Sequence, residues 1–173
     1  MKIVVDTNVL ISAVLWKGAP SDALKIILEK HSLVQSQSTL KEFQKVLRRE
    51  KFARILERRK LTVETVIETL IRQSRLYNVS KQAGVTARDV KIEDVDDLIF
   101  IELALEASAE FVISGDKHLL DLDEVGSIRI LSVAEFLRLD HEKEIVPKTD
   151  KLAVNGKDKR EQGKKGYPHK GLA

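Results

Sequence analysis

The sequence predicts an α/β domain with three layers, α/β/α, in which helices cover a mainly parallel central sheet of about four to five strands. Two short runs of β-branched and aromatic residues, Ile3-Val4-Val5 and Phe111-Val112-Ile113, have the composition of strands buried on both faces. Longer segments between such runs repeat their apolar residues at helical spacing. Strands that alternate with helices are typical of βαβ units, whose strands pair in parallel.

In the first half of the chain, strands are expected at residues 3–5, 33–34 and 76–79. A short apolar helix is expected at 9–15, and Ser21 is expected to cap a helix at 22–30. The sequence Thr39-Leu40-Lys41-Glu42 has the form of a capping box, which predicts a helix capped by Thr39 with Glu42 as the reciprocal acid. Further helices are expected around 52–56 and after Thr62.

In the second half, an acidic run at 94–97 leads into a helix rich in Ala and Leu that ends near Ser108. Strands are expected at 111–114 and 128–131, where the residues are mainly β-branched or aromatic. Ser132, with Glu135 three residues later, is expected to cap a last helix that ends near Leu139. Residues 84–93 are polar and show no regular periodicity.

The chain is expected to divide at about residue 139. Residues 1–139 carry the predicted elements and form one domain, whereas residues 140–173 hold two of the three Pro and four of the eight Gly. From His141 onward, nine Lys and Arg stand against five Asp and Glu. Such a segment buries too little apolar surface to offset its ordering entropy. We therefore expect residues 140–173 to form a flexible basic tail.

Composition excludes several classes of protein. The chain has no Cys, which removes disulfides, thiolate metal sites and a cysteine nucleophile, and favours the cytoplasm. No apolar run approaches the roughly 20 residues that a membrane-spanning helix needs. The first strand follows Met1 almost at once, so no signal peptide is expected. A net charge of +3 does not by itself indicate a nucleic-acid-binding protein.

Acidic residues follow two of the predicted strands at the point where each strand ends. Asp6 comes directly after Ile3-Val4-Val5, and Asp116 follows the strand at 111–114 after a glycine. The carboxyl ends of parallel strands meet at one edge of a sheet, where α/β folds bind their ligands, so these two carboxylates can converge. Each also has a purely structural explanation, because Asp6 can cap the next helix and Gly115-Asp116 is a common turn pair.

Two further carboxylates are candidates for the same edge. Asp96 and Asp97 extend the apolar stripe of the following helix at its N-terminal end, and an acid on an inward face requires a partner. The alternative is that Asp94 caps this helix and Asp97 supplies the acid of its first turn. Glu42 has the strongest structural explanation of the four, because its capping box accounts for it without any chemistry.

A cluster of carboxylates with no Cys and few His favours a hard divalent cation, Mg²⁺ or Mn²⁺. Such an ion activates water and offsets the charge on a phosphoryl oxygen. The chemistry indicated by these residues is therefore hydrolysis of a phosphodiester bond.

Four motifs, in order along the chain, resemble those of the PIN domain family: Asp6-Thr7-Asn8, Glu42 in Lys41–Leu47, the acidic run that ends at Asp97, and Ser114-Gly115-Asp116. The resemblance covers about residues 1–139 and is greatest to the prokaryotic VapC-type ribonucleases, which are the toxins of toxin–antitoxin pairs.

The resemblance implies a metal-dependent nuclease specific for single-stranded RNA. It assigns Asp6, Glu42, Asp97 and Asp116 to catalysis and metal binding, with support from Asn8, which would hold Asp6, and from Ser114, Asp94 and Asp96. RNA would be the substrate and a cognate antitoxin the protein partner, and a homodimer is expected.

Basic residues after Glu42 could guide a phosphate backbone towards the acids. Arg48, Arg49 and Lys51 are the candidate RNA contacts in this stretch, although a solvated helix face explains them equally well. Trp16 is more typical of packing or a dimer contact than of base stacking, and His118 is more typical of a structural residue than of a general acid.

Two other functions fit parts of the pattern. A haloacid-dehalogenase-like phosphotransferase would use Asp6 as its nucleophile, but such enzymes have a second Asp where this chain has Asn8. A non-catalytic binding module with a PIN-like fold would be expected to lose at least one of the four carboxylates.

Overall fold

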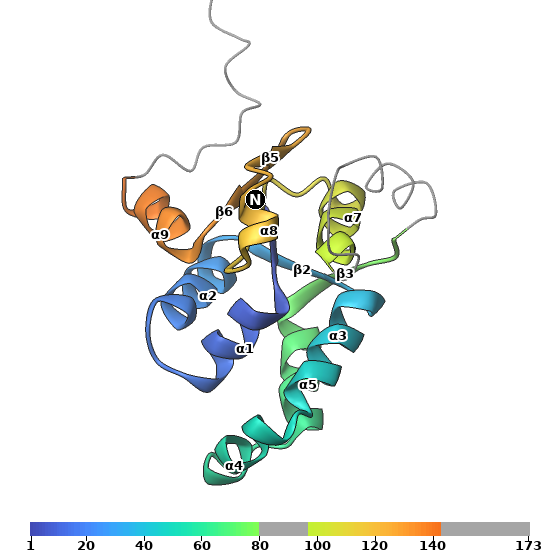
Figure 1. The fold of residues 1–173 in the computed structure, drawn as a ribbon, viewed down its shortest axis with the longest axis vertical. Coiled ribbons are helices and arrows are strands. Elements are labelled where there is room, and N and C mark those ends of the chain that lie inside the picture. The colour runs from blue at the N-terminus through green and yellow to red at the C-terminus, as the bar shows by residue number, and fades with distance from the viewer. Residues whose placement is uncertain (80–96, 143–173) are drawn as a thin grey trace, which may run out of the picture.

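Strands in the described part of the chain form one sheet, in the order β3-β2-β1-β4-β6-β5 (Figure 1). The computed structural model describes residues 1–79 and 97–142. All neighbouring strands are parallel except β5 and β6, which are antiparallel. The strands are β1 (Lys2–Val5), β2 (Ser32–Ser36), β3 (Ser74–Tyr77), β4 (Phe111–Ile113), β5 (Glu124–Val125) and β6 (Ile128–Leu131).

Helices cover both faces of the sheet, which confirms the predicted α/β class and its three layers. Side chains alternate between the faces along each strand, so Ile3 and Val5 join one buried cluster while Val4 joins the other. The helices are α1 (Thr7–Leu15), α2 (Ala19–Lys30), α3 (Gln37–Leu47), α4 (Glu50–Arg58), α5 (Val63–Gln73), α7 (Leu98–Ala107), α8 (Lys117–Leu120) and α9 (Val133–His141).

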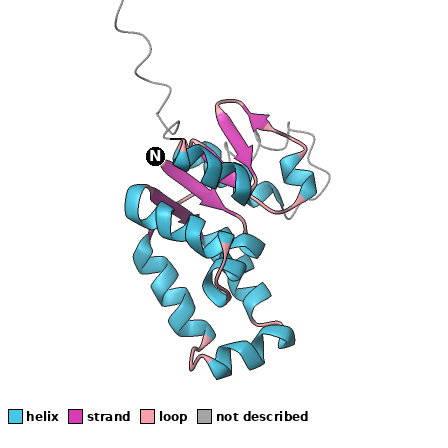
Figure 2. Cartoon of the chain, turned by 90° about the vertical axis from the view of Figure 1, so that its left-hand side faces the viewer, coloured by secondary structure: helices cyan, strands magenta, loops and turns pink. Residues whose placement is uncertain are grey.

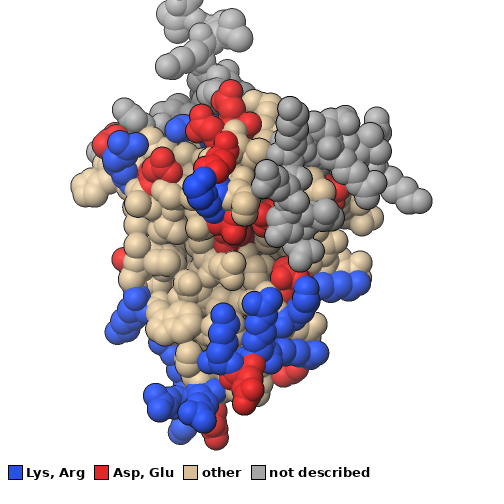
Figure 3. Space-filling model, viewed as in Figure 1, with Lys and Arg blue, Asp and Glu red and all other residues tan. Residues whose placement is uncertain are grey.

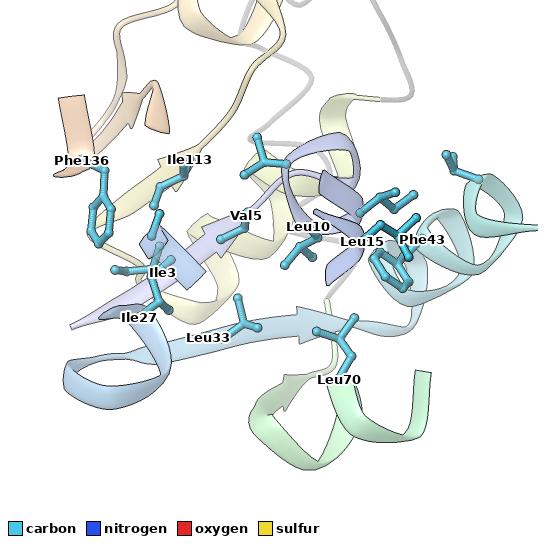
Figure 4. Packing of buried hydrophobic residues seen from close by; sticks show 14 of the residues in the cluster. Ile3, Val5, Leu10, Leu15, Ile27, Leu33, Phe43, Leu70, Ile113 and Phe136 are labelled. Atoms are coloured by element: carbon cyan, nitrogen blue, oxygen red, sulfur yellow. The ribbon is translucent and has the colours of Figure 1, made fainter. Parts of the chain in front are cut away.

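The larger buried cluster lies between the sheet and the helices α1, α2, α3, α5 and α9 (Figure 4). Phe43 of α3 and Phe136 of α9 are completely buried in it, and Figure 4 shows them at opposite ends of the cluster, Phe43 near Leu15 of α1. The second cluster joins the opposite face of the sheet to α7 and α8. Burial of a large apolar side chain contributes about 1.5–3 kcal/mol, so these two layers fix the strand ends in place.

Helices α3, α4 and α5 form an arm that extends away from the sheet, with α4 at its far end (Figures 1 and 2). Phe43, Val46 and Leu47 of α3 are buried, as their spacing predicts. Phe52 and Leu56 bury one face of α4, whose opposite face is exposed and rich in Arg and Lys. The arm thus carries a basic surface to one end of the molecule.

The sheet has six strands in the described residues, where four to five are predicted. The additional strand, β5, has only two residues, and the flanking sequence is acidic and turn-like, so no apolar run marks it. Strand β3 begins at Ser74, two residues before the predicted start, because α5 ends there and the chain enters the sheet directly. Helix α9 continues to His141, two residues beyond the predicted end.

Two of the predicted helix caps are wrong. Helix α2 begins at Ala19 with Gly18 as its N-cap, because Pro20 is tolerated in the first helical turn, and Ser21 lies inside the helix. Helix α3 begins at Gln37, since Ser36 is the cap and Thr39 is its reciprocal partner. The predicted box of Thr39 with Glu42 therefore does not form.

Two other predicted caps are confirmed, and some further predictions concern residues that the structure does not describe. Thr62 caps α5, and Ser132 caps α9 with Glu135 as its reciprocal acid. The predicted start of the helix before Asp97, the polar stretch at 84–93 and the tail beyond residue 142 lie outside the described residues. Among the helices of residues 1–79 and 97–142, none is long and apolar enough to cross a membrane.

A half-buried histidine makes the stability of this fold depend on pH. His31 follows α2 and packs edge-on against Phe136, with 6.3 Å between the ring centroids. Burial, followed by the positive charge of the chain's amino terminus, lowers the pKa of His31 below its ordinary value of 6.5. The folded protein therefore binds a proton at His31 less readily than the unfolded chain does.

We expect the melting temperature of the wild type to fall as pH decreases through 6.5 towards the lower folded pKa of His31. Above 6.5 the stabilisation associated with the neutral ring is fully present. His31→Gln removes the titrating group, so the decline between about pH 7.5 and 5.5 should be smaller in this variant. Thermal unfolding followed by circular dichroism measures the difference, and parallel declines in both proteins would contradict the assignment.

Candidate functional site

The candidate site lies where the strand order reverses, between β1 and β4. From β1 the sheet extends through β2 to β3 on one side and through β4 to β6 on the other. Open α/β sheets bind ligands at such a switch point, outside the carboxyl ends of the strands. Asp6 is the first residue after β1, and its backbone N–H donates to the carbonyl oxygen of Ile113 at 3.0 Å.

The carboxylate of Asp6 is held by three hydrogen-bond donors. Oδ1 accepts from the backbone N–H of Val9 at 2.7 Å, which makes Asp6 the N-cap of α1. Oδ2 accepts from the Ser114 hydroxyl and from the backbone N–H of Gly115 at 2.9 Å. Only 3% of the residue is exposed. Asp6 is therefore both a helix cap and a fixed carboxylate at the switch point, so the two interpretations of this residue are compatible.

Ser114 joins the two strand ends through a single hydroxyl group. It is completely buried, donates to Asp6 and accepts from the backbone N–H of Asp116 at 2.9 Å. Asp116 in turn caps the short helix α8, since its Oδ1 accepts from the backbone N–H of His118 at 2.8 Å. Capping uses one oxygen of Asp116, and the half-buried carboxylate still lines the cleft described below.

Helices α3 and α7 bring the other two predicted acids to the same place. Glu42 lies in the second turn of α3, beyond the capping box, so capping does not explain it. Its Oε2 pairs with Nζ of Lys45 at 3.3 Å. Asp97 is the N-cap residue of α7, but its side chain makes no capping hydrogen bond. The alternative that Asp94 caps this segment, with Asp97 as the acid of its first turn, involves residues outside the described part of the chain and stays a prediction.

One cleft of about 170 Å³ unites these four carboxylates. Four segments far apart in the sequence contribute to it, namely the end of β1, α3, the start of α7 and the end of β4. Its lining consists of Asp6, Thr7, Asn8, Glu42, Val46, Arg49, Asp97, Phe100 and Asp116. The convergence that the sequence predicts for Asp6, Asp97 and Asp116 is thus present, and Glu42 joins them.

Three residues of the lining, Thr7, Val46 and Phe100, were not among the predicted site residues. Thr7 is 5% exposed, and its hydroxyl oxygen has no hydrogen-bond partner in the described residues. Val46 and Phe100 form an apolar wall. The sequence does carry a signal for Thr7, because it follows Asp6 directly, whereas nothing in the sequence places the other two at the cleft.

Of the other residues considered in the sequence, some line the cleft and some do not. Asn8 lines the cleft and is exposed, but the donors that hold Asp6 are Val9, Ser114 and Gly115. Arg49 also lines the cleft. Trp16 packs edge-on against Phe52, with 6.1 Å between the centroids, as expected for a packing residue. Asp94 and Asp96 lie outside the described residues.

The donor set fits a hard divalent cation. Carboxylate oxygens and the unpartnered hydroxyl of Thr7 are the ligand types that Mg²⁺ and Mn²⁺ prefer, and Mg²⁺ usually keeps several waters beside one or two carboxylates. Within residues 1–79 and 97–142, no three acidic or histidine side chains lie close enough together to hold one ion directly. The residues that would hold an ion are Asp6, Glu42, Asp97 and Asp116, in part through water.

A family model described as PIN domain matches residues 2–118 of this chain. The chain belongs to the PIN domain family. The family indicated by the four sequence motifs is therefore confirmed, and the match includes every one of the four acids. Membership of this family also sets aside the haloacid-dehalogenase-like alternative.

Two solved structures are similar to this one. A chain from the crystal structure of VapBC2 from Rickettsia felis, bound to a DNA fragment from their promoter, has a TM-score of 0.57 and 11% identity, over 76% of this chain and 98% of that chain. VapC20 of Mycobacterium tuberculosis, described as a Sarcin-Ricin loop cleaving toxin, has a TM-score of 0.48 and 16% identity, over 73% and 98%. At 11% identity the first match shows a shared fold. No curated protein matches the sequence.

The position of Ser114 predicts that its hydroxyl stabilises the site. In Ser114→Ala, the backbone N–H of Asp116 and one oxygen of Asp6 lose a buried partner, so we expect a loss of about 1–3 kcal/mol in the free energy of unfolding. Urea unfolding measures it. Ser127→Ala, in the exposed turn between β5 and β6, is the matched control and should change little. Equal stability of the two variants would contradict the bridging role.

Proposed function

We propose that this protein is a divalent-metal-dependent endoribonuclease that hydrolyses phosphodiester bonds in single-stranded RNA. The observation that carries the proposal is the meeting of Asp6, Glu42, Asp97 and Asp116 in one cleft at the switch point of the sheet. Asp6 and Asp116 also cap helices, whereas Glu42 lies beyond the capping box of α3. Since Glu42 has no capping role, packing and capping alone do not account for the arrangement.

Each residue has a specific task in this proposal. Asp6 has a fixed position, because three donors hold its carboxylate. The Ser114 hydroxyl bonds both Asp6 and the backbone N–H of Asp116 and so holds these two residues together. Glu42 and Asp97 approach from helices on opposite faces of the sheet and complete the acidic set. When bound, the cation lowers the pKa of water and offsets charge on the phosphoryl oxygens. Asn8 is exposed at the same cleft and is placed to bind substrate or ordered water.

The position of Asp6 favours single-stranded RNA as the substrate. Because Asp6 is almost completely buried, a phosphodiester must enter the cleft to approach it. A flexible single strand can present one phosphate in this way more readily than a duplex, and single-stranded loops are where proteins usually contact individual nucleotides of RNA. We therefore expect structured RNA to be cut in its loops.

The resemblance to VapC-type ribonucleases supports a role as the toxin of a toxin–antitoxin pair, and the fold shared with a VapBC2 chain is consistent with it. An antitoxin requires a docking surface. An apolar groove between α1, α2, β2 and α5 could hold a segment of such a partner; its apolar lining is Val14, Leu24, Leu33, Leu61, Val66 and Leu70. The homodimer stays a prediction.

Cleavage of a labelled RNA pool tests the proposal. We expect wild-type protein to cut single-stranded positions in the presence of Mn²⁺ or Mg²⁺, to lose activity in EDTA and to regain it when the ion is restored. Glu42→Gln, which removes one charge from the acidic set, should lower kcat/KM more than tenfold, equivalent to about 1.4 kcal/mol in the barrier.

The control for Glu42→Gln is Glu57→Gln, which removes the same charge from the exposed face of α4 and should cleave like wild type. Because Glu42 is not a cap, its variant should also keep the melting temperature of wild type within a few degrees. Activity that persists in chelator would reject the metal dependence, and a fully active Glu42→Gln would remove Glu42 from the acidic set. Wild-type protein that does not cleave RNA in the presence of either ion would favour a non-catalytic PIN-like module.

A further inference from the structure

A second, shallower groove adjoins the acidic cleft on the side of α3. It is lined by Ser38, Lys41, Glu42, Lys45 and Ile99. Glu42 belongs to both lining sets, so the shallow groove and the acidic cleft meet at this carboxylate. Figure 3 shows Lys and Arg side chains gathered over the α3, α4 and α5 part of this face. The groove therefore leads from a basic surface to the acids.

Three cations recur every four residues along this path: Lys41, Lys45 and Arg49. Lys41 and Lys45 lie one helical turn apart on α3, about 6 Å along the axis. Arg49 follows the end of α3 and lines the acidic cleft itself. All three are exposed, and in residues 1–79 and 97–142 neither Lys41 nor Arg49 has an ion-pair partner. Lys45 pairs only with Glu42, through a contact in which its side chain is 65% exposed.

Other basic residues of the arm are directed elsewhere. Arg48 pairs with Glu64 of α5 at 3.3 Å, Lys51 lies over the ring of Phe52 at 4.8 Å, and Arg59 donates to the carbonyl oxygen of Val14 at 3.3 Å. These exposed contacts are weak, and neither Arg48 nor Lys51 lines the acidic cleft. Of the three candidate RNA contacts in the sequence, only Arg49 lies at the acids.

We propose that Lys41, Lys45 and Arg49, here called the α3 track, bind successive phosphates of the RNA strand and lead it past Glu42 into the acidic cleft. This inference rests on the proposed function and specifies its substrate-binding surface. Ammonium and guanidinium groups bind phosphates without reading base identity. The track therefore contributes affinity and register, and it makes binding depend on salt concentration.

Fluorescence anisotropy with a labelled single-stranded RNA oligonucleotide tests the track in EDTA, where no cleavage occurs. Each phosphate contact in a single strand contributes about 0.7 to the slope of log K against log salt concentration. Lys41→Gln/Lys45→Gln should therefore lower the magnitude of the slope by about 1.4. The control Lys25→Gln/Arg72→Gln removes the same charge from exposed positions on α2 and α5 and should keep the wild-type slope.

Steady-state cleavage supplies a second readout. Lys41→Gln should raise KM and leave kcat near the wild-type value, because Lys41 binds the strand away from the reacting phosphate. The proposal is overturned if wild type binds and cleaves RNA while the α3 variants keep its slope and KM, or if Arg48→Gln/Lys51→Gln loses as much of the slope. Wild-type protein that neither binds nor cleaves RNA would reject the proposed function together with the track.

Discussion

The hydrogen bonds that hold the carboxylate of Asp6 determine the arrangement of the whole site. They tie the N-terminus of α1 to the end of β4, through the backbone N–H groups of Val9 and Gly115 and the hydroxyl of Ser114. Because β1 and β4 are neighbouring central strands buried on both faces, the positions of these donors are fixed by the core. A carboxylate is thus buried at the edge of the core, and three donors compensate its desolvation.

The same constraint explains how distant segments reach one cleft. Helix α3 packs Phe43 and Leu47 into the larger core, which leaves Glu42 at the strand ends. Helix α7 packs Phe100 and Leu103 against the opposite face, which brings the preceding residue, Asp97, to the same edge. Glu42 and Asp97 are therefore positioned by the apolar residues that anchor their helices in the two cores.

Apolar periodicity was sufficient to predict the layers, the parallel strands and the edge at which Asp6 and Asp116 meet, because these features follow from local patterns and general rules of α/β topology. The start of α3 was mispredicted because two overlapping capping boxes compete, and Ser36 with Thr39 prevails over Thr39 with Glu42. The bridge made by Ser114 and the path of Lys41 and Lys45 depend on contacts between distant segments or on the surface beside the cleft. The four-residue spacing of Lys41 and Lys45 is visible in the sequence, but their place beside the acids is not.

The central claim is that the four carboxylates act together as one cation site, and thermal unfolding with and without Mn²⁺ tests it most directly. Binding to the folded state adds about 2.7 kcal/mol to stability when the ion is at 100 times its dissociation constant. We predict that Mn²⁺ raises the melting temperature of wild type and of Asp22→Asn, an exposed control on α2, and that Asp97→Asn loses most of this increase. An undiminished Mn²⁺ response in Asp97→Asn would contradict the account.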